Sequence, residues 1–281
     1  MRARMRCRLE GPAMTTMPDT PEPDDDDLSP LLSEPFARAW AAPAPGLPAR
    51  LGERLGQRLA QSLKAEQGMV TVRRRSSPAD ALAVGAQQRW LYRAPADRTA
   101  RPGEPRAASV IELQAGARLA LPAGGVREFL VVRGSAEVDG ESLGLRDFLL
   151  LPAGSAPELA SADGAHVFVR EADGAGAERT LVRDREAGWP EFAPGIRRRV
   201  LWTAGGEAAL LYRTDPGASV PVHSHGHDEE CLMVQGELFL DDVLLQQGDY
   251  QLAPAGTGHR ITETDTGVII YAHGDLDLQF T

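Results

Sequence analysis

Cysteine and aromatic residues are scarce in this chain of 281 residues. It has two cysteines, Cys7 and Cys231, and only 5% of its residues are aromatic. Two thiols so far apart in sequence exclude both a disulfide framework and a Cys-x-x-Cys metal or redox pair. We therefore expect the protein to work in the reducing cytoplasm.

Positive charge is also in short supply. The 30 Lys and Arg residues are outnumbered by 40 Asp and Glu residues, which leaves a net charge of −10 at pH 7. Nucleic-acid binding needs clustered Lys and Arg, so we expect no nucleic-acid partner. The basic residues near the N-terminus are not followed by a long apolar stretch. We therefore expect neither a signal peptide nor a membrane anchor.

The first part of the chain predicts little folded structure. Residues 1–47 include PDTPEPDDDDLSP, which is rich in Pro and Asp and has no aromatic residue. Such a composition is typical of a disordered tail and linker. Residues 48–87 predict a short helix followed by a strand, because leucine recurs every fourth residue from Leu51 to Leu63. This helix, over 48–66, has one apolar stripe that either docks onto the rest of the chain or binds a protein partner.

The residues with metal-binding chemistry are concentrated between Gly217 and His259. His223, His225, Glu229 and His259 all lie in this stretch. Imidazole nitrogens and a carboxylate oxygen are donors that divalent transition metals accept. Alternation along an extended strand places His223 and His225 on the same side. These residues predict one divalent metal ion per chain, zinc or iron in the first place and manganese or nickel as alternatives.

Short strands and tight turns surround these donors and suit a small antiparallel barrel with its ligands on inward faces. In the strand EECLMV, Glu229 shares one face with Cys231 and Met233. Strand alternation adds Tyr250 and Tyr271 as further residues lining a pocket or supporting the ligands. For Cys231 two interpretations stay open, a buried core thiol and a redox-active group.

The same stretch resembles the cupin signature in both of its halves. The pattern G-x5-H-x-H-x3-E-x6-G is matched from Gly217 to Gly236, and G-x5-P-x-G-x2-H is matched from Gly248 to His259. The resemblance implies a jelly-roll barrel, also called a double-stranded β-helix, with a metal ion held by the three His and the Glu. Glu263 stands where the family usually has Asn, a residue that is not a ligand.

An earlier part of the chain repeats this pattern about 102 residues upstream. The segment QAGARLALPAGGVREFLVVRGSAEVDG is similar to DPGASVPVHSHGHDEECLMVQGELFLDD. Pro122, Gly124 and Pro157 take the positions of the three His, and Arg127 or Glu128 falls near the position of the Glu. Because no imidazole is left, this copy is predicted to bind no metal in this way.

The sequence therefore predicts an all-β fold of two tandem cupin barrels, with a disordered tail and a short helix before them. We expect the metal-free barrel over 88–175 and the metal-binding barrel over 189–281. The resemblance to cupins, whose barrels commonly pair, also makes us expect a homodimer. A small molecule is the expected ligand of the barrel.

The sequence around the metal motif more narrowly resembles the cupin-like domain of ChrR-type anti-sigma factors, from RRVLW to GDYQLAPAGTGH. That resemblance implies a stress-sensing module that releases a sigma factor held by an N-terminal zinc-binding domain. Such a domain needs several His and Cys residues, whereas here Cys7 stands alone and no His precedes His166. We therefore interpret the chain as a regulatory, ChrR-like bicupin without the zinc anti-sigma domain.

Two other functions stay open on sequence alone. Some small cupins of similar sequence are dioxygenases, and a ferrous ion on these donors would leave positions for oxygen and a small diketone or hydroxyketone. The third function is a structural zinc site. A closed set of four protein ligands would favour structure, whereas an open position would favour catalysis or ligand sensing.

Overall fold

The computed structural model describes positions 51–54, 56, 57 and 60, and then residues 68–95, 104–174, 177–277 and 279–280. The tail expected over 1–47 lies outside the described residues. The described positions between 51 and 60 are helical, in agreement with part of the expected helix. No described helix has both the length and the apolar character needed to cross a membrane. The chain divides into residues 1–53 and 54–281, and the two barrels lie in the second of these units.

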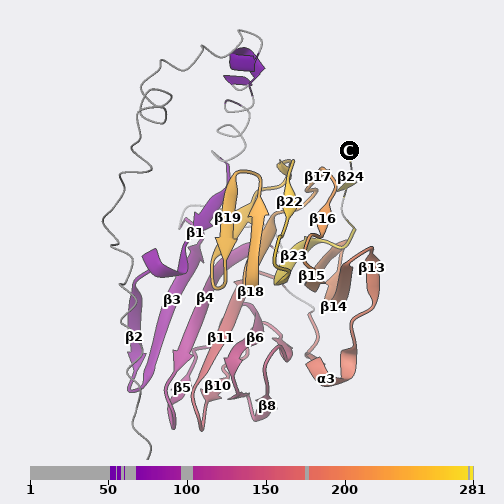
Figure 1. Cartoon of the computed structure of the whole chain (residues 1–281). Helices are drawn as coiled ribbons and strands as arrows, with labels where there is room; N and C mark the ends of the chain where they lie inside the picture. Colours follow the sequence, from indigo (N-terminus) through magenta and orange to yellow (C-terminus); the bar gives the residue numbers. More distant parts are fainter. Residues whose placement is uncertain are drawn as a thin grey trace, which may run out of the picture. The chain divides into compact units, whose positions relative to one another are not determined.

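The first barrel is built from two antiparallel sheets (Figure 1). The larger sheet has the strand order β12-β9-β6-β11-β4-β3-β2, and the smaller has the order β5-β10-β7-β8. Both sheets turn alternate apolar side chains toward a shared core that includes Phe129, Leu149 and Val167. The strands are β2 (Ala79–Ala83), β3 (Ala86–Arg93), β4 (Pro105–Leu113), β5 (Arg118–Ala120), β6 (Val126–Gly134), β7 (Ala136–Val138), β8 (Glu141–Leu143), β9 (Phe148–Leu151), β10 (Glu158–Ala160), β11 (Ala165–Ala172) and β12 (Thr180–Val182).

The second barrel repeats this arrangement. Its ten-stranded sheet follows the path β1-β20-β18-β23-β15-β14-β13 with β16, β19 and β22 attached, and a three-stranded sheet has the order β21-β17-β24. The strands are β13 (Glu191–Ala193), β14 (Ile196–Ala204), β15 (Glu207–Thr214), β16 (Ser219–Val220), β17 (His223–Ser224), β18 (Glu229–Leu240), β19 (Val243–Gln246), β20 (Tyr250–Ala253), β21 (Gly258–His259), β22 (Thr262–Glu263), β23 (Val268–Asp275) and β24 (Gln279–Phe280). The prediction of two tandem all-β barrels is therefore confirmed.

Each barrel sheet is extended by a strand from outside its own repeat. Strand β1 (Val70–Val72) precedes the first barrel in sequence, yet it pairs with β20 of the second barrel. Strand β12 follows the first repeat and pairs with β9 of the first barrel. A 3-10 turn, η1 (Arg74–Ser76), follows β1, and the short helix α3 (Asp184–Ala187) follows β12. Strand β1 thereby ties the segment before the first barrel to the second barrel through backbone hydrogen bonds.

The faces of the two large sheets also share one apolar core. It combines Leu91 and Phe168 of the first barrel with Leu232 and Tyr271 of the second, all nearly fully buried. The rings of Phe168 and Tyr271 are 4.9 Å apart between centroids. Burying one large apolar side chain contributes about 1.5–3 kcal/mol, so this shared core holds the barrels against each other.

A buried polar cluster lies in the same interface, and we call it the inter-barrel cluster. Arg170 of the first barrel binds Glu230 of the second and lies 3.2 Å from Oε1 of Glu128. The hydroxyl of Tyr250 donates to Glu230 at 2.6 Å, and the hydroxyl of Tyr271 donates to Glu128 at 2.5 Å. Each carboxylate is thus bonded to a donor of the other barrel, which compensates for its removal from water.

Candidate metal centre

Backbone pairing brings three His residues of the second barrel together. His223 in β17 and His259 in β21 are Cα partners in an antiparallel pair, so their side chains lie on one face. His225 follows β17, and its N–H donates to the carbonyl of Thr257 at 2.9 Å. This bond holds the loop before His259 against the loop after His225. Glu229 is the first residue of β18, which places its carboxylate at the same end of the barrel.

The donor atoms of His223, His225 and Glu229 lie within 4.8 Å of one another, and all three residues are buried. This spacing can hold a metal ion. The ring of His259 lies next to this group, with its centroid 5.1 Å from that of His225 and 5.6 Å from that of His223. A buried His-His-Glu set is therefore present, with a third imidazole at its edge.

Hydrogen bonds leave one ring nitrogen of two His residues free for an ion. The Nδ1 atom of His223 lies 3.0 Å from the carbonyl of Pro221, and Nδ1 of His259 lies 3.2 Å from Oδ2 of Asp241. Such bonds fix the ring and direct Nε2 toward a metal. The Nε2 atoms of His225 and His259 are buried without a hydrogen-bond partner among the described residues. Unsatisfied buried nitrogens of this kind fit a transition-metal ion.

The charges of the site also suit a cation. Burial opposes ionisation of Glu229, but its neighbours, His225 first, outweigh burial and lower the pKa of this carboxyl to about 2. Burial lowers the pKa of His223. Burial acts in the same way on His225, but Glu229 outweighs it and raises the pKa of that imidazole. The result is an ionised carboxylate beside imidazoles that lose their protons when a metal binds.

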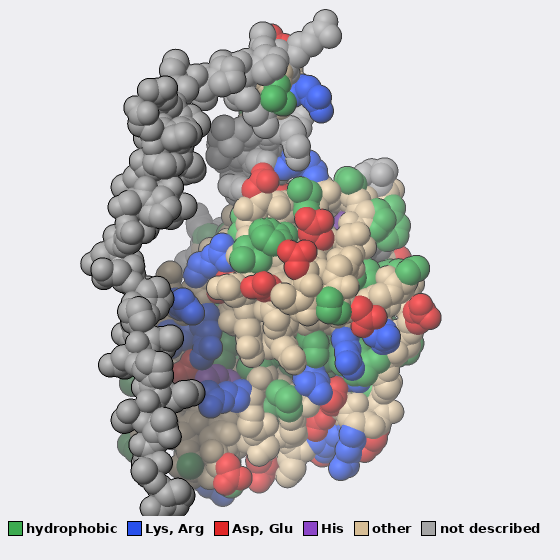
Figure 2. All heavy atoms as spheres, viewed as in Figure 1, with side chains coloured by type: hydrophobic (Ala, Val, Ile, Leu, Met, Phe, Trp, Pro, Cys, Tyr) green, Lys and Arg blue, Asp and Glu red, His purple; other side chains and the backbone are tan. Residues whose placement is uncertain are grey.

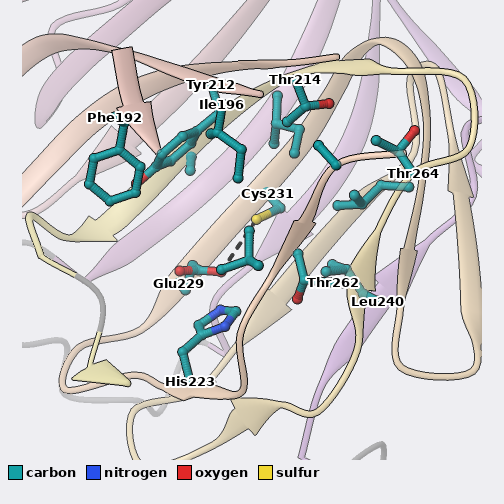
Figure 3. A pocket seen from close by; sticks show the side chains of 15 residues that line it. Phe192, Ile196, Tyr212, Thr214, His223, Glu229, Cys231, Leu240, Thr262 and Thr264 are labelled. Carbon is teal, nitrogen blue, oxygen red and sulfur yellow. Dashed lines mark hydrogen bonds between the residues drawn. The ribbon is translucent and has the colours of Figure 1, made fainter. Parts of the chain in front are cut away.

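A cavity of about 60 Å³ opens from the donor set into the barrel (Figure 3). Figure 3 shows His223 and Glu229 at one side of it and Phe192, Ile196 and Tyr212 farther along. Its wall is largely apolar, with a few hydroxyl groups. It is lined by Phe192, Ile196, Tyr212, Thr214, Ala218, Val220, His223, Glu229, Cys231, Leu238, Leu240, Thr262, Thr264, Ile270 and Ala272. A small, mostly apolar ligand with one polar end matches this shape.

Cys231 lines the cavity, and Met233 lies in the barrel core next to it. The thiol of Cys231 donates to Oε1 of Glu229 at 3.5 Å, as the dashed line in Figure 3 shows. Burial and then the charge of Glu229 raise the pKa of Cys231 well above its usual value. The group is therefore a protonated thiol, which favours the interpretation as a core residue over that as a reactive thiolate.

Tyr250 and Tyr271 do not lie at the metal centre. Both side chains are fully buried in the interface with the first barrel, where they donate to Glu230 and Glu128. Their strands turn the neighbouring residues inward instead, as Ala272 in the cavity wall illustrates. This alternation corrects the expectation that the two tyrosines line the pocket. The sequence alone did not show which residues of β20 and β23 point inward.

Asp241 contacts a residue of the candidate site, and the sequence did not reveal this contact. It lies at the turn after β18, at a φ of 53°, and its Oδ1 accepts the backbone N–H of Arg260 at 2.8 Å. Its other oxygen contacts His259. The neighbouring His259 and Arg260 lower the pKa of this carboxyl despite its burial. The only sequence signal was a pair of Asp residues at a hairpin tip, which is also typical of an ordinary turn.

A comparison with protein families finds a match for the part of the chain that contains the second barrel. The family described as the ChrR Cupin-like domain matches residues 177–277. These residues contain all four expected ligands and also β12, the strand that completes the first barrel. A comparison with curated protein sequences finds no match.

Solved structures are similar to this chain over about three quarters of its length. Oxalate decarboxylase of Bacillus subtilis is similar with a TM-score of 0.55 at 16% identity, covering 73% of this chain and 76% of that one. Oxalate decarboxylase of Lactobacillus farciminis gives 0.55 at 14% identity, covering 75% and 87%. A protein of Nostoc punctiforme, provisionally assigned as a dioxygenase, gives 0.57 at 13% identity, covering 74% and 83%. At these identities the likeness establishes the fold alone.

The family match and the fold agree with the site. The barrel that carries the buried His-His-Glu set is the part that matches the ChrR Cupin-like domain, and the full two-barrel unit has the fold of bicupins. Residues 177–277 therefore match the ChrR Cupin-like domain, and the two barrels together have the fold of the solved structures named above.

Proposed function

We propose that the protein is a metal-dependent regulatory module that senses a small molecule in its second barrel. The observation that carries this proposal is the cavity that opens directly from the donor set, lined by His223, Glu229 and Cys231. A ligand entering it reaches both the metal position and an apolar wall. The match to the ChrR Cupin-like domain supports a regulatory role.

Zinc or iron is the proposed ion, with manganese and nickel as alternatives. We assign His259 as the fourth ligand, because its Nδ1 contacts Asp241 and its Nε2 is buried without a partner among the described residues. Three imidazoles and one carboxylate form a sufficient set for each of these ions. The oxalate decarboxylase of Bacillus subtilis has Mn(II) centres, so manganese is included in the test.

Metal analysis of protein purified without a chelator tests the ion and its stoichiometry. We expect one ion per chain. Ligand sensing is then tested by thermal shift with small apolar acids, alcohols and carbonyl compounds, first on the metal-loaded protein and then on the chelated protein. A ligand that raises the melting temperature only with metal present supports the proposal. Two ions per chain would contradict it, because the first barrel lacks the imidazoles.

A mononuclear non-haem dioxygenase is the second candidate. The same cavity favours it, because an ion with an open side can take up oxygen and a substrate together. A ferrous ion would supply oxygen activation, while the residues of the chain would orient a small diketone or hydroxyketone and exclude water. The Thr262 hydroxyl of the wall, which is buried without a hydrogen-bond partner among the described residues, would bind a polar group of that substrate.

Oxygen uptake distinguishes the two candidates. Protein loaded with ferrous iron under anaerobic conditions is mixed with a series of diketones and hydroxyketones, and oxygen is then admitted. Substrate-dependent oxygen consumption that is lost in Glu229→Gln protein would establish the enzyme and end the sensor proposal. Tight zinc without oxygen uptake would leave the sensor and remove the dioxygenase.

A regulatory module needs a protein partner, and we propose the 48–66 helix as its contact site. The described positions of this helix are exposed, including Leu51 at 40%. A crosslinking residue at position 51 should capture the partner, whereas the same residue at the exposed Val84, in the turn after β2, should not. Light scattering of the purified chain tests the homodimer that we also propose.

A further inference from the structure

A second cavity lies between the two barrels, away from the metal centre. It has a volume of about 280 Å³ and shares none of its lining residues with the metal-site cavity. Its wall combines the turn η1 with both barrels. We call it the arginine cleft, and it is lined by Arg74, Arg89, Leu91, Val110, Glu112, Val132, Arg133, His166, Leu232, Met233, Val234, Gln247 and Gly248.

Positive charge in the arginine cleft exceeds negative charge. Three guanidinium groups line it against one carboxylate, Glu112, which lies 3.4 Å from Nε of Arg89. Among the described residues, the guanidinium groups of Arg74 and Arg133 form no hydrogen bond or ion pair. Both residues are exposed, so a ligand in the cleft can reach their guanidinium groups. Figure 2 shows blue Lys and Arg side chains and a purple His gathered where the left of this face is hollowed.

The position of Arg74 is set by the fold and not by a free loop. Its backbone N–H donates to Oδ1 of Asp249 at 3.0 Å, and the neighbouring Arg73 binds Oδ2 of the same carboxylate at 2.8 Å. Its aliphatic stem lies directly over Gly248, where a Cβ would be only 2.5 Å from Cδ of Arg74. Gly248 has a φ of +88° and no side chain. Glycine therefore allows this turn and leaves room for the stem of Arg74.

The remaining walls give the arginine cleft the character of a ligand site. Leu91, Val110, Leu232 and Val234 line it and belong to the buried core between the barrels. His166 is half-buried beside the arginines, and burial, followed by Arg74 and Arg133, lowers its pKa. A fixed apolar floor with a few convergent cationic groups is typical of sites for small anions.

We propose that the arginine cleft binds the oxyanion group of a small anionic molecule, a carboxylate or a phosphate, through Arg74 and Arg133. Arg89 adds a third cation that Glu112 already holds in place. The bound anion would bridge the turn η1, the first barrel and β18, the strand that begins with the ligand Glu229. This anion site is separate from the proposed metal site in the second barrel. The anion would therefore be a second ligand that the same molecule responds to.

Calorimetric titration of the full chain with inorganic phosphate and with succinate tests this proposal and separates the two chemistries. Sodium chloride keeps the ionic strength constant, and chelated protein is used throughout because free anions also bind metal ions. We expect one saturable site for at least one of the two anions. The imidazole NMR signal of His166 should shift when the same anions are added. This signal is assigned by its loss in His166→Gln protein.

The double variant Arg74→Ala, Arg133→Ala should weaken the binding at least tenfold, because charge-assisted bonds to the anion are lost. The matched control is Arg118→Ala, Arg185→Ala, which removes the same charge from exposed residues outside the cleft and should change the affinity less than twofold. If the double variant does not fold, Arg133→Ala alone serves. Equal weakening in both pairs, or no binding beyond that of chloride, would overturn the proposal.

Discussion

The two barrels have a similar arrangement of strands, but the charged residue at the expected metal position has the opposite sign. In the second barrel Glu229 pairs with Ala253, and in the first barrel Arg127 takes the equivalent place opposite Leu151. The sequence repeat had left open whether Arg127 or Glu128 corresponds to Glu229. The strand pairing shows that it is Arg127, and that Glu128 corresponds to Glu230. A carboxylate that attracts a cation has thus been replaced by a residue that is itself a cation.

Arg127 also fills the space of the missing imidazoles. Its Nη1 donates to the carbonyl of Pro122 at 2.7 Å, and its Nε donates to Oε2 of Glu171 at 2.9 Å. A Cβ on Gly124, the residue at the position of His225, would lie 2.2 Å from Nη2 of Arg127. One barrel end is held by a built-in guanidinium, whereas the other could be held by an exchangeable ion. Only the second arrangement can respond to a metal.

The largest expected effect concerns the link between the barrels. In Arg170→Met protein, Glu128 and Glu230 lose their shared cation while buried, which should lower the free energy of unfolding by about 3–5 kcal/mol. Urea unfolding measures this change. Adding Glu128→Gln and Glu230→Gln should recover part of the loss. A loss below about 1 kcal/mol would mean that the inter-barrel cluster does not hold the two barrels together.

The next effect concerns the imidazoles. His259→Ala should reduce the metal content from one ion per chain to almost none, and it should remove about 2.7 kcal/mol of stability at a metal concentration a hundred times the Kd. Elemental analysis and thermal melting measure both changes. The matched change in the first barrel, Pro157→His, should gain no metal because Arg127 repels it. Unchanged metal content in His259→Ala protein would remove this residue from the ligand set.

Asp241→Asn tests the support of His259 and should have a smaller effect. The amide binds the imidazole less strongly, so we expect metal affinity to fall about 10–100-fold. Competition with a chromogenic chelator measures the affinity. The adjacent Asp242→Asn, whose side chain is 58% exposed, is the control and should leave the affinity within about twofold. Equal effects would point to a general loss of negative charge.

Gly124→Ala tests whether Arg127 fills the space next to Gly124 in the first barrel. The new methyl group displaces the end of Arg127, which should cost about 1–2 kcal/mol in the free energy of unfolding. Gly144→Ala, where the nearest atom is 3.7 Å from the new Cβ, should stay within about 1 kcal/mol of the parent. If both variants unfold at the same urea concentration as the parent, Arg127 does not fill this position as described.

The smallest effect is a pH dependence from His273, the residue of β23 paired with Glu230. Burial and then Arg170 lower its pKa well below 6.5. The unfolded chain therefore takes up this proton first, so stability is present above pH 6.5 and is lost as the pH falls. Below 6.5 the parent should lose about 1.4 kcal/mol more per pH unit than His273→Gln. Urea unfolding at pH 7.5 and 5.5 gives both slopes, and parallel slopes would contradict the assignment.

The sequence predicted the barrels and the donor set because both depend on local spacing. Alternation within β18 correctly separated Glu229 and Cys231 from Leu232. It failed for Tyr250 and Tyr271, because the inward side of a strand depends on its partner strands and not on its own residues. Asp241 and the arginine cleft were missed for the same reason, since they join residues from distant segments.

The pairing of β1 with β20 has a consequence for the order of events during synthesis. Val70 is made early, yet its partner Leu252 lies near the end of the chain. Likewise β9 has no partner on its outer side until Thr180 follows the whole first repeat. Contacts over such long sequence separations form slowly. The edge of the first barrel therefore stays uncovered until β12 has emerged from the ribosome, and β1 stays unpaired until β20 has emerged.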